Sequence, residues 1–413
     1  MTLAEYAADR GFFEPPSALY IHIPLCEARC GYCDFHSFAK HAFPPALQDS
    51  YVTRILEQAE GLKRQGSLEP ETLYVGGGTP TALSRDSFSR ILGGLGGLFR
   101  EGLKEWTVEA NPESLSDDAL KAMLDSGVNR ISLGIQSMVD GELESLGRRA
   151  RLADNATALR KAVDSGLEVS ADLMAAIPGQ SAESLQDSLS YLIELGLGHI
   201  SLYDLVLEKG TLLEARVKRG ELKLPGEDAA YDARKKAERL LQNQGYERYE
   251  ISNFCLPGKE SRHNGRYWSM DSYIGIGSGA VSSLMARGGA EPEAADSLLS
   301  PAFAGYGCLR IEEGKDLDAY LADPEASKVE NWIEWHDVVF ETVMMGLRTR
   351  KGLSRRRFAG RFGRDLDTVL KPGMDKWKNR FVDEGDFLRL DDRGMDLLNP
   401  ILVDILDSLQ PPK

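Results

Sequence analysis

The sequence lacks the features that mark a membrane or secreted protein. No apolar run reaches 18 residues, so no membrane-spanning helix is expected. Residues 1–15 contain Glu5, Asp9 and Arg10 and no apolar core, so no signal peptide is expected. Only five cysteines occur in 413 residues, three of them clustered, which does not suit a disulfide framework. We therefore expect a reduced, cytoplasmic protein.

Positive charge is also in short supply. The chain carries 49 Lys and Arg against 64 Asp and Glu, a net charge of -15. This balance argues against general binding to nucleic acids or to anionic membranes. No nucleic-acid partner is expected, and peripheral membrane contact stays open.

Six runs rich in Val, Ile, Leu or Tyr alternate with helix-like stretches. They cover residues 18–25, 72–78, 105–112, 130–137, 168–179 and 199–208. The stretches 45–65 and 181–196 are helix-like, and Ser181 is a suitable N-cap for the second. Such alternation predicts βα units on a parallel sheet, and six units are too few for a closed eight-fold barrel. The predicted fold is α/β, an open, partial (βα)6 TIM-like barrel.

The pattern changes after about residue 245. "GYERYEISNF" predicts one more strand, and the polar stretch Arg287–Ser297 predicts an exposed loop. From Asp316 the chain is helix-like over 316–326, 331–350, 354–363 and 367–385, and 387–400 could hold a short β-hairpin. We predict a barrel domain over 1–285, a connecting segment over 286–315 and a small, mostly helical, winged-helix-like domain over 316–413.

Three cysteines with the spacing Cys-x3-Cys-x2-Cys follow the first predicted strand: Cys26, Cys30 and Cys33. Loops after parallel strands carry the site in such folds. Thiolates suit zinc or an iron–sulfur cluster, and a structural zinc site would need a fourth ligand such as His22 or His36. A 4Fe–4S cluster on three thiolates would leave one iron open to a small molecule, and we favour this interpretation.

The cysteine stretch, with Tyr32 before its third cysteine, resembles the signature of the radical S-adenosylmethionine (SAM) superfamily. "YIHIPLC", "YVGGGTPT", "VEANPESL", "ISLGIQS", "DLMAAIPGQ", "ISLYDLVLEKGT", "YEISNF" and "SRHNGRYW" follow in order. Together they resemble the coproporphyrinogen III dehydrogenase-like family over nearly the whole chain. The resemblance implies a radical SAM barrel, a 4Fe–4S cluster on the three cysteines, and exchangeable SAM on the open iron. It also implies electron transfer into the sulfonium of SAM, which gives methionine and a 5′-deoxyadenosyl radical.

Polar residues at the predicted strand ends complete the expected SAM site. The Gly-rich turn 76–80 is a weak signal alone, but it resembles the motif that holds the methionine part of SAM. The guanidinium of Arg148 suits the carboxylate of SAM, although Ala150 stands where the family often has His or Gln. Each polar residue alone is more often ordinary surface or capping polarity. By resemblance, the SAM-binding residues are Tyr20, Gly77, Gly78, Thr79, Glu109, Gln136, Arg148 and Asp172.

"HNGRYW" (His263–Trp268) combines a histidine, an amide and two aromatics. The residues alone favour a buried histidine packed among aromatics. By resemblance the stretch matches a heme-binding motif, with His263, Asn264, Tyr267 and Trp268 as heme-binding residues and His263 as axial ligand. Val281 stands where the family commonly has a further His. The lone thiols of Cys255 and Cys308 are given no role.

Three functions are compatible with this resemblance. The chain could be a heme chaperone that transfers heme to target proteins such as respiratory enzymes, a coproporphyrinogen III dehydrogenase, or another porphyrin-acting radical SAM enzyme. The dehydrogenase typically has a further cysteine where this chain has Phe35, and a longer segment than the 25 residues that precede Cys26. The heme-chaperone branch is therefore favoured, coproporphyrinogen dehydrogenase activity is not expected, and a cellular electron donor is implied.

One basic run remains. Residues 348–364, "RTRKGLSRRRFAGRFGR", hold eight Lys or Arg. A solvated helical face is one interpretation, and a surface for porphyrin propionates or anionic headgroups is another. Binding of nucleic acid by a helix-turn-helix is the least favoured of the three.

Overall fold

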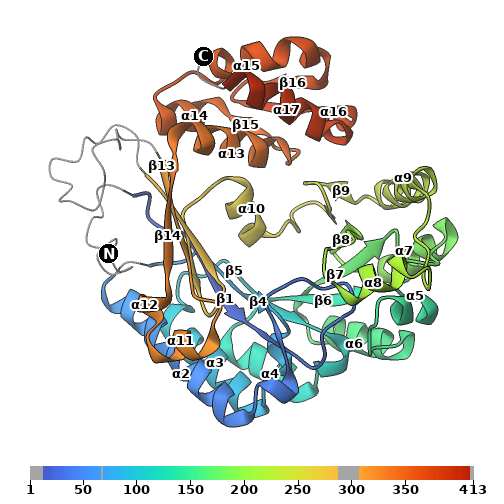
Figure 1. Ribbon diagram of the computed structural model, residues 1–413, viewed down its shortest axis with the longest axis vertical. Coiled ribbons are helices and arrows are strands. Elements are labelled where there is room, and N and C mark those ends of the chain that lie inside the picture. The colour runs from blue at the N-terminus through green and yellow to red at the C-terminus, as the bar shows by residue number, and fades with distance from the viewer. Residues whose placement is uncertain (1–12, 67, 287–306, 410–413) are drawn as a thin grey trace.

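The computed structural model describes residues 13–66, 68–286 and 307–409 (Figure 1). The loop predicted over Arg287–Ser297 lies outside the described residues. Among the described helices, none combines the length and apolarity needed to cross a bilayer.

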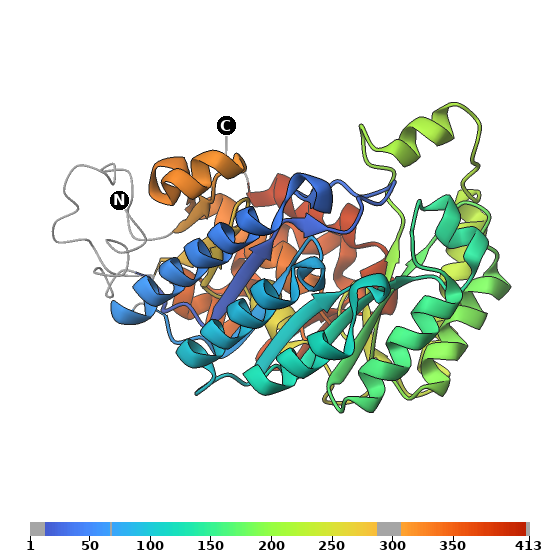
Figure 2. The same ribbon diagram turned by 90° about the horizontal axis from the view of Figure 1, so that it is seen from below.

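Six consecutive parallel strands form the centre of a 12-stranded sheet. In sheet order they are β1 (Ala18–Ile23), β4 (Thr72–Gly77), β5 (Glu105–Ala110), β6 (Arg130–Gln136), β7 (Glu168–Ala175) and β8 (His199–Asp204). Helices α2 (Pro45–Arg64), α3 (Arg85–Phe99), α4 (Asp117–Ser126), α6 (Leu152–Asp164), α7 (Ala182–Glu194) and α9 (Glu227–Asn243) alternate with them. Figure 1 shows the sheet curved into an open trough, and Figure 2 shows helices side by side over its outer face. The predicted partial (βα)6 barrel is confirmed.

The strands separate an apolar outer face from a polar inner face. In β1 the fully buried Leu19, Ile21 and Ile23 alternate with Tyr20 and His22. Successive side chains of a strand point to opposite faces, so the aliphatic side chains pack under the helices and the polar ones enter the interior of the barrel. The polar interior residues are thus fixed on a rigid, well-packed frame. Ser181 caps α7 as predicted, since its hydroxyl accepts a hydrogen bond from the Ser184 amide.

Further strands extend both edges of the sheet. β11 (Tyr273–Ile276) pairs in parallel with β1, followed by antiparallel β12 (Val281–Met285), β13 (Gly307–Glu312) and β14 (Val329–Glu334). At the other edge lie β10 (Asn253–Cys255) and β9 (Glu247–Arg248), where one more strand was predicted.

One helix prediction was wrong at its start. We predicted a helix over 331–350, but residues 329–334 form β14 and helix α13 begins at Trp335. Residues 329–334 pair along their whole length with 307–312, and this sheet pairing overrides the local helical pattern. Because β13 falls inside the predicted connecting segment, that segment supplies a strand of the sheet; the domain limits otherwise stay a prediction.

The C-terminal part combines helices with a small sheet. Helices α13 (Trp335–Leu347), α14 (Arg355–Phe362), α15 (Leu366–Met374) and α17 (Leu398–Leu409) share an apolar core with the three-stranded sheet β15 (Leu353–Ser354), β17 (Phe387–Leu390) and β16 (Phe381–Glu384). A hairpin within 387–400 was predicted, but β17 pairs with the preceding β16 and the chain after it is helical. Helix α10 (Arg262–Trp268) contacts α13, so the C-terminal domain lies against the concave side of the trough (Figure 1).

Candidate cofactor site

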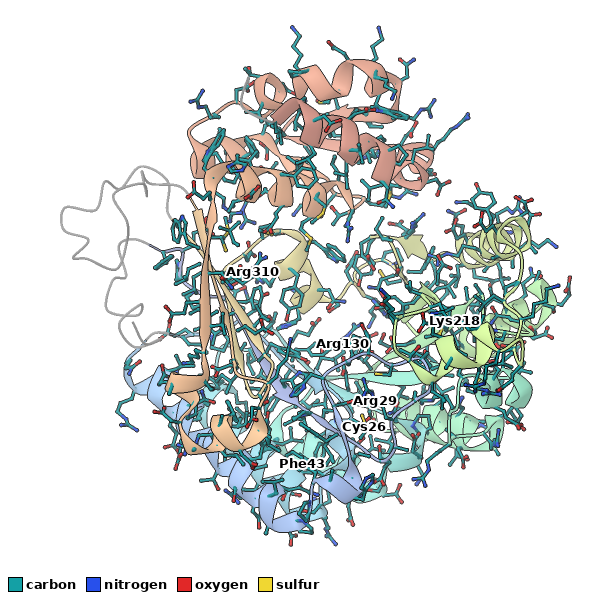
Figure 3. The ribbon with its side chains drawn as sticks, in the orientation of Figure 1. Cys26, Arg29, Phe43, Arg130, Lys218 and Arg310 are labelled. Carbon is teal, nitrogen blue, oxygen red and sulfur yellow. The ribbon has the colours of Figure 1, made fainter. Side chains whose placement is uncertain are left out.

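The three clustered cysteines lie in one loop directly after β1. Cys26 ends the short strand β2 (Leu25–Cys26), which pairs with β3 (Phe38–Ala39) at the far end of the loop. Cys30 and Cys33 lie between these strands, and the Cys33 amide donates to the Cys30 carbonyl oxygen at 3.3 Å. All three thiols are free and partly exposed, and Figure 3 labels Cys26 beside Arg29. The loop therefore presents three thiols at one end of the barrel.

Gly31 anchors the middle of this loop to two other segments. Its amide donates to the Leu146 carbonyl oxygen at 3.0 Å, and its carbonyl oxygen accepts from the Leu213 amide at 2.7 Å. A Cβ on Gly31 would lie 3.2 Å from the Leu146 oxygen, so a side chain would push the two segments apart. Segments that follow β6 and β8 thus hold the cysteine loop in place.

The Gly-rich turn after β4 docks on the start of the cysteine loop. The Gly78 amide donates to Ile23 O at 2.8 Å, and the Thr79 amide donates to Leu25 O at 2.6 Å. A Cβ on Gly78 would lie 2.6 Å from Leu25 O, which leaves room only for glycine. The Thr79 hydroxyl is directed at Cys26 Sγ, 3.6 Å away. The two predicted motifs are therefore in direct contact.

Gly77 links this turn to a buried carboxyl group. With φ of 108°, Gly77 donates its amide to Glu109 Oε2 at 3.0 Å. The other carboxyl oxygen of Glu109 accepts from the Tyr74 hydroxyl at 2.6 Å. Burial raises the pKa of Glu109 to about 7, because desolvation disfavours the carboxylate. The carboxyl group therefore titrates near neutral pH at the edge of the predicted SAM site.

Arg148 joins the cysteine loop to the ends of β5 and β6. Its Nη1 lies 3.5 Å from Cys30 Sγ, and its Nη2 donates to Asn111 Oδ1 at 3.1 Å and to Gly134 O at 2.5 Å. The side chain is almost fully buried, its Nε has no acceptor among the described residues, and its closest carboxylate is Glu113 at 3.9 Å. A buried cation with so little compensation fits a site that receives anionic ligands.

Gln136 ends β6 in a strained conformation. Its φ is 66°, in the left-handed region, and a register shift occurs between Gly134 and Gln136. A Cβ on Gly134 would lie 2.6 Å from Asn111 Oδ1 and 3.2 Å from Gln136 Nε2, so both amide groups lie next to this glycine. Strain of this kind at a strand end is typical of ligand sites. Asn111 was missed by the sequence analysis, although it lies in the quoted "VEANP" motif.

Two predicted SAM residues lie deeper in the barrel. Asp172 is buried beside Ser132, whose hydroxyl is 3.4 Å from both carboxylate oxygens, and burial raises the pKa of Asp172. The Tyr20 hydroxyl is hydrogen-bonded to His22 Nδ1 at 2.9 Å. The structure thus brings Cys26, Cys30, Thr79 and Arg148 together, whereas Tyr20 and Asp172 line the interior below them.

The two histidines considered as a fourth zinc ligand both make hydrogen bonds within the protein. Both nitrogens of His22 are engaged, one with Tyr20 and the other with the His36 carbonyl oxygen at 3.0 Å. His36 Nε2 is bonded to Ser278 Oγ at 3.2 Å. Within residues 13–66, 68–286 and 307–409, no three His, Cys, Asp or Glu side chains are grouped closely enough to hold a single metal ion.

The predicted heme motif forms helix α10, whose N-terminus is tied to the barrel. The carboxylate of Glu105 accepts hydrogen bonds from the Ser261 hydroxyl and from the amides of Arg262 and His263. Ser261 is also the N-cap, since its hydroxyl accepts from the Asn264 amide at 3.3 Å. Trp268 at the other end is partly exposed, and its Nε1 is buried without an acceptor among the described residues.

His263 itself is fully buried, with 0% of its surface exposed. Its Nδ1 is bonded to Thr72 Oγ1 at 2.9 Å and its Nε2 to Tyr267 Oη at 2.8 Å, while its ring stacks on Tyr74. Burial lowers the pKa of His263 to about 3, so the ring is neutral. This is the buried, aromatic-packed histidine that the residues alone favoured. Neither nitrogen is free for iron here, so axial ligation would require His263 to leave its pocket, and that role stays a prediction.

Among the remaining residues singled out in the sequence, Cys308 makes a side-chain hydrogen bond, with Ser283 Oγ 3.0 Å from its Sγ. Cys255 and Cys308 are buried, as expected of lone thiols. Ala150 is buried two residues after Arg148, and Val281 begins β12.

Known proteins are similar to this chain in sequence and in fold. The sequence profile of the Radical SAM superfamily matches residues 20–192, and that of the HemN C-terminal domain matches residues 334–397. The heme chaperone HemW of Lactococcus lactis is 33% identical over 397 residues, which cover 94% of this chain and 97% of that protein. HemW of Bacillus subtilis is 33% identical over 371 residues, 86% of this chain and 91% of that protein.

A mitochondrial protein and a solved structure are also similar. Radical S-adenosyl methionine domain-containing protein 1 of Mus musculus is 32% identical over 96% of this chain and 90% of its own length. The solved coproporphyrinogen III oxidase (HemN) from Escherichia coli superposes with a TM-score of 0.77 over 97% of this chain and 92% of that chain. Their identity is 18%, so this likeness concerns the fold.

Proposed function

Because the chain belongs to the heme chaperone HemW family of the radical SAM superfamily, we propose that it binds heme and transfers it to acceptor proteins. We further propose that it carries a 4Fe–4S cluster on Cys26, Cys30 and Cys33 and binds SAM beside it. The observation that carries the proposal is similarity to heme chaperones along almost the full length of both chains.

The residues of the site fit a cluster with bound SAM. Burial raises the pKa of the Cys26 and Cys33 thiols, so these groups stay neutral unless iron takes the place of the proton. Arg148 supplies a buried positive charge next to Cys30, suited to thiolates and to the carboxylate of SAM. When bound, a reduced cluster supplies an electron to the sulfonium of SAM, which is the chemistry of the superfamily.

The protein's own residues would bind and orient these groups. The amides of the Gly77–Thr79 turn already donate within the protein, so the turn would meet the methionine part of SAM through its carbonyl oxygens. Arg148 would orient the carboxylate of SAM. Glu109, Gln136 and Asp172 are proposed to contact SAM from the ends and interior of the neighbouring strands. The anchored Gly31 keeps the thiols in register with this turn.

Phe35 supports a heme carrier over a coproporphyrinogen III dehydrogenase. By resemblance, the dehydrogenase has an additional cysteine at this position. Phe35 instead presents an apolar ring that is 66% exposed beside the cysteine loop. Helix α10, with Asn264, Tyr267 and Trp268, is the proposed heme-binding element, and respiratory enzymes are the expected class of acceptor.

The test uses anaerobically purified protein with SAM, a reductant and coproporphyrinogen III. We expect four irons per chain, a stoichiometric complex with added hemin, and no formation of protoporphyrinogen. A coproporphyrinogen III oxidase serves as the positive control for activity. Formation of protoporphyrinogen by this chain would replace the carrier function with the dehydrogenase.

Cysteine variants test the cluster separately. Changing Cys26, Cys30 and Cys33 together to Ala should abolish iron binding and the visible absorbance of the cluster. Changing Cys255 and Cys308 together to Ala is the matched control, because both are distant in sequence and buried. Four irons in the triple variant would refute the assignment of these ligands.

A further inference from the structure

A cleft of about 1230 Å³ lies between the barrel domain, at β9 and α10, and the C-terminal domain. One wall is formed by residues around α10, including Ser261, Gly265 and Trp268, and the other by residues of the basic run and of β17. Pockets that bury most of a drug-sized ligand are about 300–1,000 Å³, so this cleft accepts a ligand as large as a tetrapyrrole. Figure 1 shows that α10 faces the helices of the C-terminal domain across this region.

The cleft has an excess of positive charge on the wall that the C-terminal domain forms. Seven Lys and Arg line it, and five of them pair with acids, for example Arg350 with Asp392 and Arg361 with Glu14. Within the described residues, the side chains of Lys351 and Arg356 make no ion pair and no hydrogen bond. Asp386, which accepts a hydrogen bond from the Arg356 amide at 2.9 Å, also lines the cleft and attracts the Arg356 guanidinium. Both are exposed, and Lys351 Nζ lies 5.2 Å from the centroid of the Phe387 ring. The basic run thus places two cations without a direct ion pair in one cleft.

The two walls differ in charge and in chemistry. Glu247 and Glu260 belong to the barrel wall and make no ion pair among the described residues. Asp386, the third lining acid without an ion pair in the described part of the chain, belongs to the other wall, where six Lys and Arg outnumber three acids. Trp268 contributes an indole to the barrel wall and Phe358 a ring to the other. A flat, apolar ligand with carboxylates along one edge matches this arrangement, because its acids are attracted to one wall and repelled by the other.

We propose that this cleft holds the tetrapyrrole cargo by its two propionates, through Lys351 and Arg356, and leaves the iron without a protein ligand. The proposal rests on the proposed function and adds the site to it. No His, Cys or Met is found among the described residues that line the cleft, and the hydroxyls of its two tyrosines are engaged elsewhere, Tyr246 with Leu197 O and Tyr249 with His199 Nε2. None of the side chains that commonly coordinate heme iron is therefore free in the cleft. Iron held in this way stays open to a ligand from the acceptor, which suits a carrier.

The test compares ligands on the full-length wild-type chain. Hemin, iron-free protoporphyrin IX and the dimethyl esters of both are titrated separately, with quenching of tryptophan fluorescence as the readout. We expect hemin and iron-free porphyrin to bind with similar affinity. Each dimethyl ester should bind on the order of 100-fold more weakly, because esterification removes two charge-assisted hydrogen bonds at about tenfold in affinity each.

Charge reversal tests the same contacts from the protein side. The double variant Lys351→Glu/Arg356→Glu should weaken the binding of hemin and of iron-free protoporphyrin IX by a similar factor. The weak binding of their dimethyl esters should stay unchanged. Arg364→Glu/Lys371→Glu is the matched control, because both residues are exposed and lie outside the cleft. Circular dichroism verifies that each variant is folded.

The outcomes separate the site from the function. Unchanged binding of the acids to Lys351→Glu/Arg356→Glu, or equal binding of acid and ester to the wild type, overturns the site while the heme-carrier function stands. Hemin binding far tighter than iron-free porphyrin overturns the absence of an iron ligand. Failure of the wild type to bind any of these porphyrins overturns the proposed function itself.

Discussion

The guanidinium of Arg148 lies 3.5 Å from the thiol of Cys30, and the same group donates to Asn111 and to Gly134. One buried side chain therefore fixes the cysteine loop relative to the ends of two strands. Its charge has only a distant carboxylate for compensation, Glu113 at 3.9 Å. The thiolate-bound cluster and the carboxylate of SAM would supply the missing negative charge, so binding of the cofactors and the position of Arg148 should depend on each other.

Arg148→Lys should weaken SAM binding by about tenfold or more, because an ammonium group cannot replace the planar fork of hydrogen bonds. Iron content should fall as well, since Asn111 and Gly134 lose their shared donor. Equilibrium dialysis with labelled SAM and iron analysis measure the two effects. Arg149→Lys is the control, because Arg149 is adjacent but exposed. Equal SAM affinity in both variants would contradict a SAM-binding role for Arg148.

Gly78→Ala should damage the cofactor site while the barrel stays folded. The added Cβ would lie 2.6 Å from Leu25 O, so the Gly-rich turn would move away from the cysteine loop. We expect reduced iron content and on the order of tenfold weaker SAM binding, with an unchanged circular dichroism spectrum. Gly93→Ala adds the same methyl group where nothing lies within 4 Å, so it should behave as wild type. If Gly78→Ala binds iron and SAM as the wild type does, the contact between the Gly-rich turn and the cysteine loop is dispensable.

The barrel and the cysteine loop were predictable because their signals are local. Six apolar runs bounded by turn residues specify the parallel strands, and Cys26, Cys30 and Cys33 lie within eight residues. Strand β14 was not predictable, because its residues carry a helical pattern and become a strand only by pairing with β13. Contacts between distant segments, such as Arg148 with Cys30, depend on the fold and leave no local pattern.

The dependence on contacts between distant segments also explains why the sequence did not predict the inward orientation of His263 or the cleft beside α10. The motif predicts that His263 and its aromatic neighbours act together, and they do lie together, but only the fold determines that His263 points inward onto Thr72. The cleft depends on residues about a hundred positions apart, from Trp268 to Phe387, which no sequence pattern connects. The basic run was visible in the sequence, whereas its partner surface was not.

The titration of Glu109 should appear in the stability of the protein. In the folded chain burial raises the pKa of Glu109 to about 7, above its ordinary value of 4.5. Below pH 4.5 Glu109 is protonated in both the folded and the unfolded chain, and its contribution to stability is fully present. Between these two pKa values the unfolded chain releases its proton while the folded chain keeps it. Stability therefore falls as pH rises through this window, by up to about 1.4 kcal/mol per pH unit, and the contribution is lost above the folded pKa.

Glu109→Gln should remove this dependence, because the amide resembles the protonated carboxyl group and does not titrate. Urea unfolding between about pH 4 and pH 8, followed by circular dichroism, measures the difference in unfolding free energy between variant and wild type. This difference should grow through the window and level off above it. Glu101→Gln, an exposed residue, should show no such trend. A constant difference for Glu109→Gln would mean that the pKa of Glu109 is the same in the folded and unfolded chain.

His263 offers the sharpest test of how heme is held. His263→Ala removes a fully buried ring and leaves the hydroxyls of Thr72 and Tyr267 without partners. We expect a loss of unfolding free energy on the order of 2–4 kcal/mol, measured by urea denaturation. If His263 acts only by supporting α10, the variant should lose affinity for hemin and for iron-free protoporphyrin IX by the same factor.

Tyr267→Phe supplies the control for His263, because it keeps the imidazole and frees its Nε2. From the structure we expect a loss of about 1 kcal/mol in unfolding free energy and an unchanged Soret maximum of the hemin complex. Axial ligation, the role that the sequence motif implies, gives the opposite pattern. Hemin would then bind Tyr267→Phe at least as tightly as wild type, while His263→Ala would shift the Soret band and lose affinity for hemin alone. That pattern would mean that His263 leaves its pocket to bind iron.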